Sequence, residues 1–281
     1  MSQRWLITGS SRGLGRALAE AALDAGHRVV ATARDPDALR DLVERHGPAV
    51  RLAELDVTDS DAAARAVALA VEAFGGLDVV VNNAGYGDIG SVEDTALEDF
   101  RRQIDANLFG AIIVTKAAIP LMRAQRSGRF IQVSSVGGRL GAPGRAAYSA
   151  AKWAIEGFSE VLAQEMNLVG VKVTIIEPGG LRTDFAGAST RLVAGRAEYD
   201  AVVGRAARMQ AQYDGRQPGD PKKAAQVILQ VAAMDEPPLR LPLGSDAIAA
   251  ISAADRSRLA ELERWGALSV STDYDEIGAF Q

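Results

Sequence analysis

The sequence predicts an α/β fold in which a doubly wound parallel sheet is covered by helices on both faces. Short apolar runs rich in valine, isoleucine and leucine alternate along the chain with longer segments of helical periodicity. The runs are apolar throughout rather than at alternate positions, as is typical of strands buried on both faces. In folds of this class, ligands bind beyond the carboxyl ends of the strands.

The expected strands and helices follow one another in strict alternation over the first two thirds of the chain. The strands are RWLIT (4–8), RVVATA (28–33), VRLAEL (50–55), LDVVVN (77–82), GRFIQVSS (128–135) and VKVTIIEP (171–178). The helical patterns lie at 13–25, 36–46, 59–74, 95–126 and 147–170.

Several helix ends carry signals of their own. Asp35-Pro36 suits a capping residue followed by proline in the first turn, and Asp220-Pro221 suggests the same for a helix at 221–234. Gly26 and Gly170 are expected to end helices.

The alternation breaks at residues 182–219, which are rich in alanine, glycine and arginine. We expect short helices here that form a lid over a ligand, with an insertion of no function as the alternative. A last strand at 239–244 and a helix at 253–265 lie in the C-terminal segment, 239–281. Because no linker or repeat interrupts the pattern, the chain is interpreted as a single domain over residues 1–281.

Composition excludes several classes of function. The chain has 281 residues, a net charge of −5, no cysteine and only two histidines, His27 and His46, both expected at the surface. A nucleic-acid-binding surface needs a basic patch, so no nucleic acid is expected as a partner. The residue types also argue against a metal site and a Ser-His-Asp arrangement. Proton transfer must then fall to a carboxylate, a lysine or a tyrosine.

The location of the protein is inferred from the absence of membrane and export signals. We expect no apolar stretch to approach the length that spans a bilayer, and the N-terminus lacks the pattern of a secretory signal. The sequence therefore predicts a soluble cytoplasmic protein with no membrane partner.

A glycine-rich turn follows the first expected strand. TGSSRGLG (8–15) places Gly9, Gly13 and Gly15 between that strand and an amphipathic helix. At such a turn, the pyrophosphate of a dinucleotide can approach bare backbone and the N-terminus of a helix. The spacing is G-x-x-x-G-x-G rather than G-x-G-x-x-G, and a plain turn that needs glycine is the alternative.

The end of the second strand favours NADP over NAD. An acidic residue at this point commonly binds the ribose hydroxyls of NAD. Here the chain has Ala33 and Arg34, and the following Asp35 is already explained as a helix cap. Arg12 lies in the glycine turn itself, and two guanidinium groups suit a 2′-phosphate. We therefore predict NADP(H) as the cofactor.

A tyrosine and a lysine stand four residues apart in AYSAAKW (147–153), so Tyr148 and Lys152 share one face of a helix. A phenol with a pKa of about 10 is a poor base at pH 7, and a nearby ammonium would stabilise tyrosinate. Lowering that pKa by two units needs about 2.7 kcal/mol, which one partly desolvated charge pair can supply. The spacing alone is too common in proteins to establish a function.

Taken in order, these motifs resemble the short-chain dehydrogenase/reductase family in its shorter, single-domain branch. The matching segments are TGSSRGLG (8–15), LDVT (55–58), NNAG (82–85), NLFG (107–110), VSS (133–135), YSAAK (148–152) and PGGLRT (178–183). They span residues 4–185 and imply a Rossmann-type fold. Residues 186–281 match more loosely, and they look like the hydroxysteroid- and retinol-dehydrogenase-like members.

The resemblance implies a catalytic group formed by Asn107, Ser135, Tyr148 and Lys152. Tyr148 would exchange a proton with the substrate oxygen, which Ser135 would also hydrogen-bond, and Lys152 would hold the nicotinamide ribose. Asn107 would hold a water in a proton relay, with a solvated or capping asparagine as the alternative. Ser134 is the alternative to Ser135, because neighbouring strand residues point to opposite faces.

The resemblance also implies which residues bind the cofactor. Asp56 would face the adenine amine, and Thr183 would bond the nicotinamide carboxamide or the pyrophosphate. The NNAG segment would follow the adenosine ribose or stabilise its strand end. The full set is Gly9, Ser11, Arg12, Gly13, Leu14, Gly15, Arg34, Asp56, Val57, Asn83, Ala84, Gly85, Tyr148, Lys152, Pro178, Gly179 and Thr183.

The leading hypothesis is an NADP(H)-dependent oxidoreductase that interconverts a ketone or aldehyde and an alcohol by hydride transfer. The alternatives are an NADP-binding regulatory protein without turnover and, less well matched, a nucleotide-sugar epimerase or dehydratase. A bulky apolar substrate is expected between the loops 86–95, 136–146 and 182–215. The residues expected to line its pocket are Phe185, Leu192, Val193, Tyr199 and Met209. Helices 95–126 and 147–170 are expected to pair between the subunits of a homo-oligomer, a dimer or tetramer.

Overall fold

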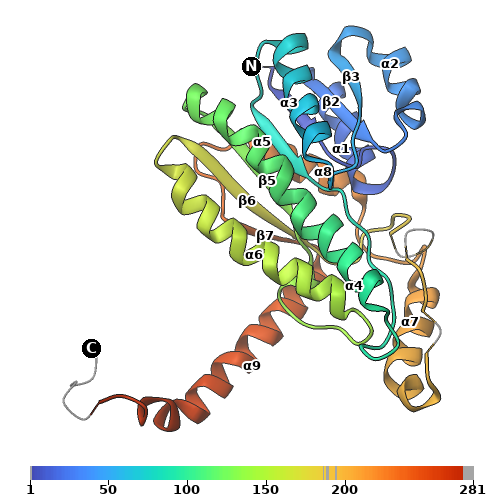
Figure 1. Cartoon of the computed structure of the whole chain (residues 1–281), viewed down its shortest axis with the longest axis vertical. Helices are drawn as coiled ribbons and strands as arrows, with labels where there is room; N and C mark the ends of the chain where they lie inside the picture. Colours follow the sequence, from blue (N-terminus) through green and yellow to red (C-terminus); the bar gives the residue numbers. More distant parts are fainter. Residues whose placement is uncertain (1, 186, 188–189, 194, 275–281) are drawn as a thin grey trace.

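A seven-stranded parallel sheet forms the centre of the molecule (Figure 1). The structure is a computed structural model that describes residues 2–185, 187, 190–193 and 195–274. Its strands lie in the order β3-β2-β1-β4-β5-β6-β7. They are β1 (Arg4–Ile7), β2 (Arg28–Ala33), β3 (Val50–Glu54), β4 (Val79–Asn82), β5 (Gly128–Val133), β6 (Val171–Pro178) and β7 (Arg240–Leu243). The doubly wound α/β sheet expected from the sequence is confirmed.

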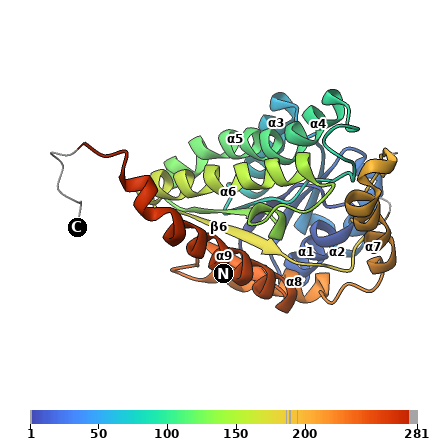
Figure 2. The same ribbon diagram turned by 90° about the horizontal axis from the view of Figure 1, so that it is seen from below.

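Helices cover both faces of this sheet (Figure 2). Helices α1 and α8 pack on one face, and α3, α5 and α6 pack on the other. The α-helices are α1 (Gly13–Asp24), α2 (Arg40–His46), α3 (Ser60–Phe74), α4 (Leu97–Ile104), α5 (Gly110–Gln125), α6 (Ala146–Asn167), α7 (Arg205–Tyr213), α8 (Pro221–Ala233) and α9 (Ser245–Val270).

The continuous apolar runs of the strands follow from burial on both faces. In β1, Trp5 and Ile7 belong to the core under α1 and α8, whereas Leu6 belongs to the core under α3 and α5. All three side chains are fully buried. Successive residues of a strand point to opposite faces, so apolar side chains at consecutive positions of a strand covered on both sides can all be buried.

The strand order places a crevice at one edge of the sheet. The order runs from β1 outward to β3 in one direction and from β4 to β7 in the other, so the direction reverses between β1 and β4. Ligands of doubly wound sheets bind at this reversal, beyond the carboxyl ends of the strands. The glycine turn follows β1 and the NNAG segment follows β4, which brings both to the crevice.

The predicted caps are present at the helix ends. Asp35 Oδ1 accepts a hydrogen bond from the backbone N of Asp37 at 3.0 Å, and Asp220 Oδ1 accepts one from Lys222 N at 2.8 Å. Gly26 and Gly170 follow helices with φ of +79° and +77°, a conformation that favours glycine.

The structure differs from the predicted helices at three places. Residues 36–46 form a 3₁₀ turn (Pro36–Leu39) before α2, and a π-helical turn (Asp105–Phe109) divides 95–126 into α4 and α5. The helix expected at 253–265 is part of the longer α9, whose C-terminal half projects away from the sheet (Figure 1). In the lid region, the expected short helices are present as a 3₁₀ turn (Ala197–Tyr199), a π-helical turn (Asp200–Gly204) and α7.

One helical stretch contradicts the expectation about membrane-spanning length. By length and composition alone, Leu97–Gln125 is long and apolar enough to cross a membrane, and 28% of its most apolar window is buried. Within it, Val114, Ala118 and Met122 are fully buried in the core under α3. This packing explains their apolar character as part of the α/β layer.

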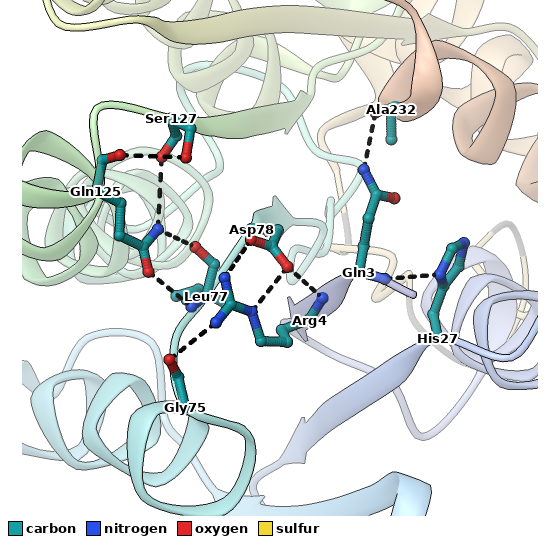
Figure 3. A network of polar contacts seen from close by, with 9 residues as sticks. All are labelled: Gln3, Arg4, His27, Gly75, Leu77, Asp78, Gln125, Ser127 and Ala232. Atoms are coloured by element: carbon teal, nitrogen blue, oxygen red, sulfur yellow. Dashed lines mark hydrogen bonds and ion pairs between the residues drawn. The ribbon is translucent and has the colours of Figure 1, made fainter. Parts of the chain in front are cut away.

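A polar network joins the amino ends of β1 and β4 (Figure 3). Asp78 accepts hydrogen bonds from the backbone N of Arg4 at 2.8 Å and from its Nε at 2.8 Å and Nη2 at 2.5 Å. Burial alone would raise the pKa of Asp78, but the bonds from Arg4 hold it below its usual value. Nearby, His27 accepts from Gln3 N at 3.0 Å and stacks on Trp5. Both His27 and His46 are partly buried, so the expectation that they lie at the surface is met only in part.

Candidate active site

A cavity of about 1110 Å³ opens at the carboxyl ends of the strands, between the glycine turn and the lid region. Of the catalytic and cofactor-binding residues predicted from the sequence, only Gly15 does not line it. A Cβ on Gly15 would collide with Gly9 O and Asn83 Nδ2, so this glycine lets α1 pack directly beneath the turn. The sequence motifs thus meet in one place.

The glycine turn leaves backbone groups facing the cavity. Gly9 and Gly13 have φ of +69° and +59°, which a side chain would strain. Helix α1 starts at Gly13, and neither a capping side chain nor an acid occupies its first turn. Its first amides are therefore available to an anion, and the bare glycines let the anion approach them.

Asn83 fastens this turn from the neighbouring strand. Its Nδ2 donates to Thr8 O at 2.9 Å and to Gly9 O at 3.2 Å, while Thr8 Oγ1 accepts from the backbone N of Asn83 and of Ala84. Of the two roles left open for the NNAG segment, the side chain of Asn83 stabilises the strand end. Ala84 and Gly85 line the cavity.

The far end of the cavity carries the two arginines expected at the ribose. Arg12 and Arg34 are exposed and line it, and Asp35 is engaged as the cap described above. Asp56 also lines it, and hydrogen bonds from the backbone N and hydroxyl of Thr58 hold its pKa below the usual value. The charge of Arg34 adds to that effect.

Tyr148 and Lys152 lie one turn apart on α6, and both are buried. Lys152 Nζ donates to Val133 O at 2.7 Å and lies 5.7 Å from the centre of the Tyr148 ring. The Tyr148 side chain is hydrogen-bonded with Ser135, whose Oγ also accepts from Gly137 N at 3.0 Å. Ser134 Oγ lies instead against Gly138 and Glu156, as strand alternation requires.

Burial acts on both of these ionisable groups. It lowers the pKa of Lys152 to about 8, although the charge of Glu156 opposes the change. It raises the pKa of Tyr148 above its usual value, opposed by the hydrogen bond from Ser135 and the charge of Arg145. In this structure, burial of the phenol is the larger effect on the pKa of Tyr148; the sequence-based expectation of a lowered pKa relied on the positive nicotinamide of the oxidised cofactor as well as on Lys152.

Asn107 sits in the π-helical turn, and its side chain is buried. Its Nδ2 donates to Tyr86 O and Gln103 O, both at 2.8 Å, whereas its Oδ1 is buried without a partner among the described residues. A Cβ on Gly85 would lie 2.5 Å from that Oδ1 and 3.8 Å from Lys152 Nζ. The unpaired acceptor and the ammonium therefore face the same small space, and a solvated asparagine is excluded.

The lid region differs from its predicted role in substrate binding. Phe185 lines the cavity and lies 5.5 Å from the ring of Tyr148. The other four expected lining residues, Leu192, Val193, Tyr199 and Met209, do not reach it, and Leu192 and Met209 are 61% and 58% exposed. Polar residues that the sequence did not single out take their place: Arg145, Gln210, Tyr213 and Gln217.

Ion pairs hold the lid against the loop that follows β4. Arg191 pairs with Asp88 and Asp99, and Arg196 pairs with Glu93 and Asp94. Residues Ile89 and Leu192 also form an isolated parallel bridge. Within the residues described, no group of three histidine, cysteine, aspartate or glutamate side chains could hold a metal.

Comparison with known proteins places this architecture in a family. The family described as short chain dehydrogenase matches residues 3–192. Oxidoreductase BOA17 of Botryotinia fuckeliana is 47% identical to this chain, in an alignment that covers 97% of this chain and 100% of that protein. A short-chain dehydrogenase structure from Streptomyces avermitilis superposes with a TM-score of 0.91 at 39% identity, covering 98% of this chain and 100% of that one.

A more distant structure contains a nucleotide. The alcohol dehydrogenase from Thermococcus sibiricus, complexed with 5-hydroxy-NADP, gives a TM-score of 0.70 at 25% identity over 86% of this chain and 96% of that chain. The family match, the near-complete coverage of the relatives and the sheet with its glycine turn agree with one another. The chain therefore belongs to the short-chain dehydrogenase/reductase family of oxidoreductases.

Proposed function

We propose that this oxidoreductase uses NADP(H) to interconvert a ketone or aldehyde and an alcohol. The observation that carries the proposal is the meeting of Tyr148, Lys152 and Ser135 in a cavity that also contains the glycine turn. No described histidine lines this cavity. Among the phenols that line it, Tyr148 is the one hydrogen-bonded with Ser135 and beside Lys152, so it is the group suited to exchange a proton with a substrate oxygen.

The glycine turn and the start of α1 fit the phosphates of a dinucleotide. Side chains at Gly9 and Gly15 would collide with Ala84, Asn83 or the backbone of the turn itself, so the glycines keep the turn close-packed, and α1 begins without a side-chain cap. Such a helix start stabilises negative charge. When bound, the nicotinamide of the cofactor supplies or accepts the hydride, and the protein orients the reactants and moves the proton.

The side chains of the site have separate roles in proton transfer and in binding the substrate oxygen. Tyr148 donates its phenolic proton to the substrate oxygen in reduction and recovers it in oxidation. Ser135, already bonded to Tyr148, holds the same oxygen and stabilises charge that develops there. With a pKa of about 8, Lys152 is largely protonated at pH 7 and can return a proton to Tyr148. The unpaired Oδ1 of Asn107 can hold a water beside Lys152.

The preference for NADP(H) is proposed from the two arginines at the far end of the cavity. Arg12 and Arg34 line this end of the cavity, where two guanidinium groups suit a 2′-phosphate, and Asp35, the acid that follows β2, is engaged as a helix cap. A structural neighbour crystallised with 5-hydroxy-NADP supports the same choice. Charge reversal in Arg34→Glu should lower kcat/KM for NADPH by about 10²-fold, whereas Arg65→Glu on the exposed face of α3 should not. Equal efficiency of NADH and NADPH in the unmodified enzyme would contradict this assignment.

The reaction is tested by following NADPH oxidation against a panel of ketones and aldehydes. Tyr148→Phe removes the proton donor and keeps the ring, so kcat should fall by about 10²–10⁴-fold with little change in NADPH affinity. Tyr274→Phe is the matched control, because Tyr274 is 81% exposed. Tight NADPH binding without turnover of any carbonyl compound would instead support the regulatory alternative.

The assembly and the location of the protein are also proposed. Large apolar side chains stand exposed on the helices expected to pair between subunits, among them Phe109 at 49%, Val161 at 54% and Leu168 at 79%. We infer a homo-oligomer, a dimer or tetramer, that buries this face; light scattering showing a monomer at assay concentrations would refute it. The cytoplasmic location stays a prediction from the sequence, which fractionation of cells would test.

A further inference from the structure

Arg145 lies beside the proposed proton donor. It is the residue immediately before α6, three positions ahead of Tyr148, and it lines the cavity. A Cβ on Gly87 would lie 3.0 Å from Arg145 Nη1 and 2.9 Å from Tyr148 Cδ2, so guanidinium and phenol flank the same point. Its Cζ is 6.0 Å from the centre of the Phe185 ring, which lies at the lid. Arg145 therefore borders the space where a substrate must bind.

The guanidinium of Arg145 has few hydrogen-bond acceptors within reach. Its Nη1 donates to Gly87 O at 2.6 Å, and it forms no ion pair with any carboxylate in the part of the chain that the structure describes. Asp88 exerts an attractive charge on it, but that carboxylate is paired with Arg191. A guanidinium carries five N–H donors, so most of its hydrogen-bonding capacity is left for another partner.

This environment contrasts with that of other partly buried arginines in the chain. Arg4, Arg16 and Arg139 each bind a carboxylate, and the pKa of each is raised. Burial lowers the pKa of Arg145 instead, as it does at Arg129, and neither guanidinium forms an ion pair among the described residues; of the two, only Arg145 lines the cavity. A desolvated guanidinium gains most from an anion that can accept two parallel hydrogen bonds.

We propose that Arg145 binds an anionic group of the substrate, so that the enzyme acts on a ketone or aldehyde that carries a carboxylate. This inference rests on the proposed carbonyl chemistry and deepens it. The cofactor phosphates are not the partner, because Arg145 stands between Tyr148 and the lid, whereas the phosphates belong at the glycine turn. A carboxylate is favoured over a phosphate, because one guanidinium already attracted by Asp88 cannot balance a second negative charge.

Two other roles for Arg145 make different predictions. Its charge favours ionised Tyr148, so it could act as a positioning residue through the phenol. Its bond to Gly87 O could instead serve only to hold the loop after β4 against α6. Either role would affect charged and neutral substrates alike, whereas recognition of an anion affects only the charged one.

The test compares keto acids with their methyl esters, using NADPH and the full-length enzyme. The probes are phenylglyoxylate and 4-oxo-4-phenylbutanoate, which place the carboxylate at two distances from the ketone. We expect kcat/KM to favour at least one acid over its ester by about 10-fold or more. Arg145→Gln should reduce that ratio by about 10- to 100-fold, and Arg145→Lys should retain part of it. Arg205→Gln, at an exposed arginine of the lid, is the matched control.

Two further readouts separate the outcomes. Because the charge of Arg145 favours ionised Tyr148, the pH profile of kcat for the ester should move to higher pH in Arg145→Gln, together with a loss of the acid-to-ester ratio. A shifted profile with an unchanged acid-to-ester ratio would overturn the inference in favour of a role through Tyr148. Reduction of acid and ester with equal efficiency would also overturn it, while the proposed function stands.

Calorimetry with the enzyme–NADP⁺ complex measures binding without turnover. Tighter binding of acid than ester, lost in Arg145→Gln but without reduction of any ketone, would support the anion site and refute the proposed function.

Discussion

At the amino ends of β1 and β4, Asp78 accepts three hydrogen bonds from Arg4. At the carboxyl ends of the same part of the sheet, Asn107 Oδ1 is buried without a partner among the described residues, and Lys152 donates only to a backbone carbonyl. The partly buried Arg4 and Asp78 satisfy each other within the protein, whereas the buried Oδ1 of Asn107 does not find a partner in the described part of the chain. Buried polar groups normally find partners, so those left over indicate where a ligand completes the structure. We infer that the amino end contributes stability and the carboxyl end contributes function at the expense of stability.

The largest effect is expected from Lys152→Met, which keeps the length of the side chain and removes its charge. Loss of the proton supply to Tyr148 should lower kcat by about 10²–10⁴-fold. The pKa of Lys152 is lowered from 10.5 to about 8, so between these pH values the unfolded chain binds more protons than the folded one. Stability of the unmodified protein should therefore rise with pH from 8 to 10.5, by an amount on the order of 3 kcal/mol.

Denaturant unfolding of the cofactor-free proteins at several pH values checks this window. The difference in unfolding free energy between the two proteins cancels the other titrating groups. Lys152→Met should be the more stable protein at pH 7, and its advantage should shrink toward pH 10.5. If Lys152→Met were inactive and also less stable than the unmodified protein at pH 7, burial of Lys152 would not cost stability. The inferred difference between the two ends of the sheet would then be wrong.

A second prediction concerns the glycine turn. In Gly15→Ala, the added Cβ would meet the backbone of Gly9 and the side chain of Asn83, so α1 must move away from the turn. NADPH affinity, measured by fluorescence titration, should fall by about 10²-fold because the phosphate contacts depend on that approach. Gly26→Ala is the matched control: its φ is +79°, but nothing lies within 4 Å of the new Cβ. It should lose about 1 kcal/mol of stability and retain its affinity for NADPH.

The opposite outcome is expected at the amino end. Asp78→Asn keeps the shape of the Arg4 network and removes its charge, so we expect a loss of about 1–3 kcal/mol of stability and a change in kcat below about 2-fold. The folded-state pKa of Asp78 is lowered, so its contribution is present above the unfolded pKa and is lost as pH falls through the folded value. The difference from Asp78→Asn should accordingly shrink in acid. Glu72→Gln, on the exposed side of α3, should show neither effect.

These contrasts also separate what local sequence could predict from what it could not. The strands, the glycine turn and the face shared by Tyr148 and Lys152 depend on patterns within a few residues, and the cavity brings them together as expected. The direction of Leu192 and Met209 depends on how the lid folds back over distant residues, which no local pattern encodes. Composition suggested an apolar lining there, and the structure exposes both side chains instead.

The pKa shifts and charge pairing of the site residues were the hardest properties to predict from the sequence. A lysine one turn from a tyrosine suggested a lowered phenol pKa, but desolvation depends on everything packed around the pair. The sequence did not single out Arg145, because the chain contains many arginines. Only the structure shows that no carboxylate among the described residues forms an ion pair with it. Asn107 is turned into the site by a π-helical turn, which helical periodicity cannot anticipate.

The smallest effect is expected at the lid, where charges are paired but exposed. The side chain of Arg191 is 54% exposed while it pairs with Asp88 and Asp99, so salt screens these pairs and each contributes little. Backbone bonds from Ile89 N to Arg191 O at 2.9 Å and from Val193 N to Ile89 O at 2.8 Å hold the same contact without charge. Arg191→Gln should therefore raise KM for a neutral ketone ester by only about 2- to 5-fold at saturating NADPH.

Ionic strength isolates this contribution. In the unmodified enzyme, KM for the neutral ester should rise toward the value of Arg191→Gln as sodium chloride increases, whereas the variant should respond little. Arg208→Gln is the control, because Arg208 pairs with Asp200 inside the lid itself and does not join it to the loop after β4. Parallel salt responses in all three proteins would mean that the backbone bonds alone close the lid. The lid would then resemble the amino end of the sheet, held by contacts that are independent of the ligand.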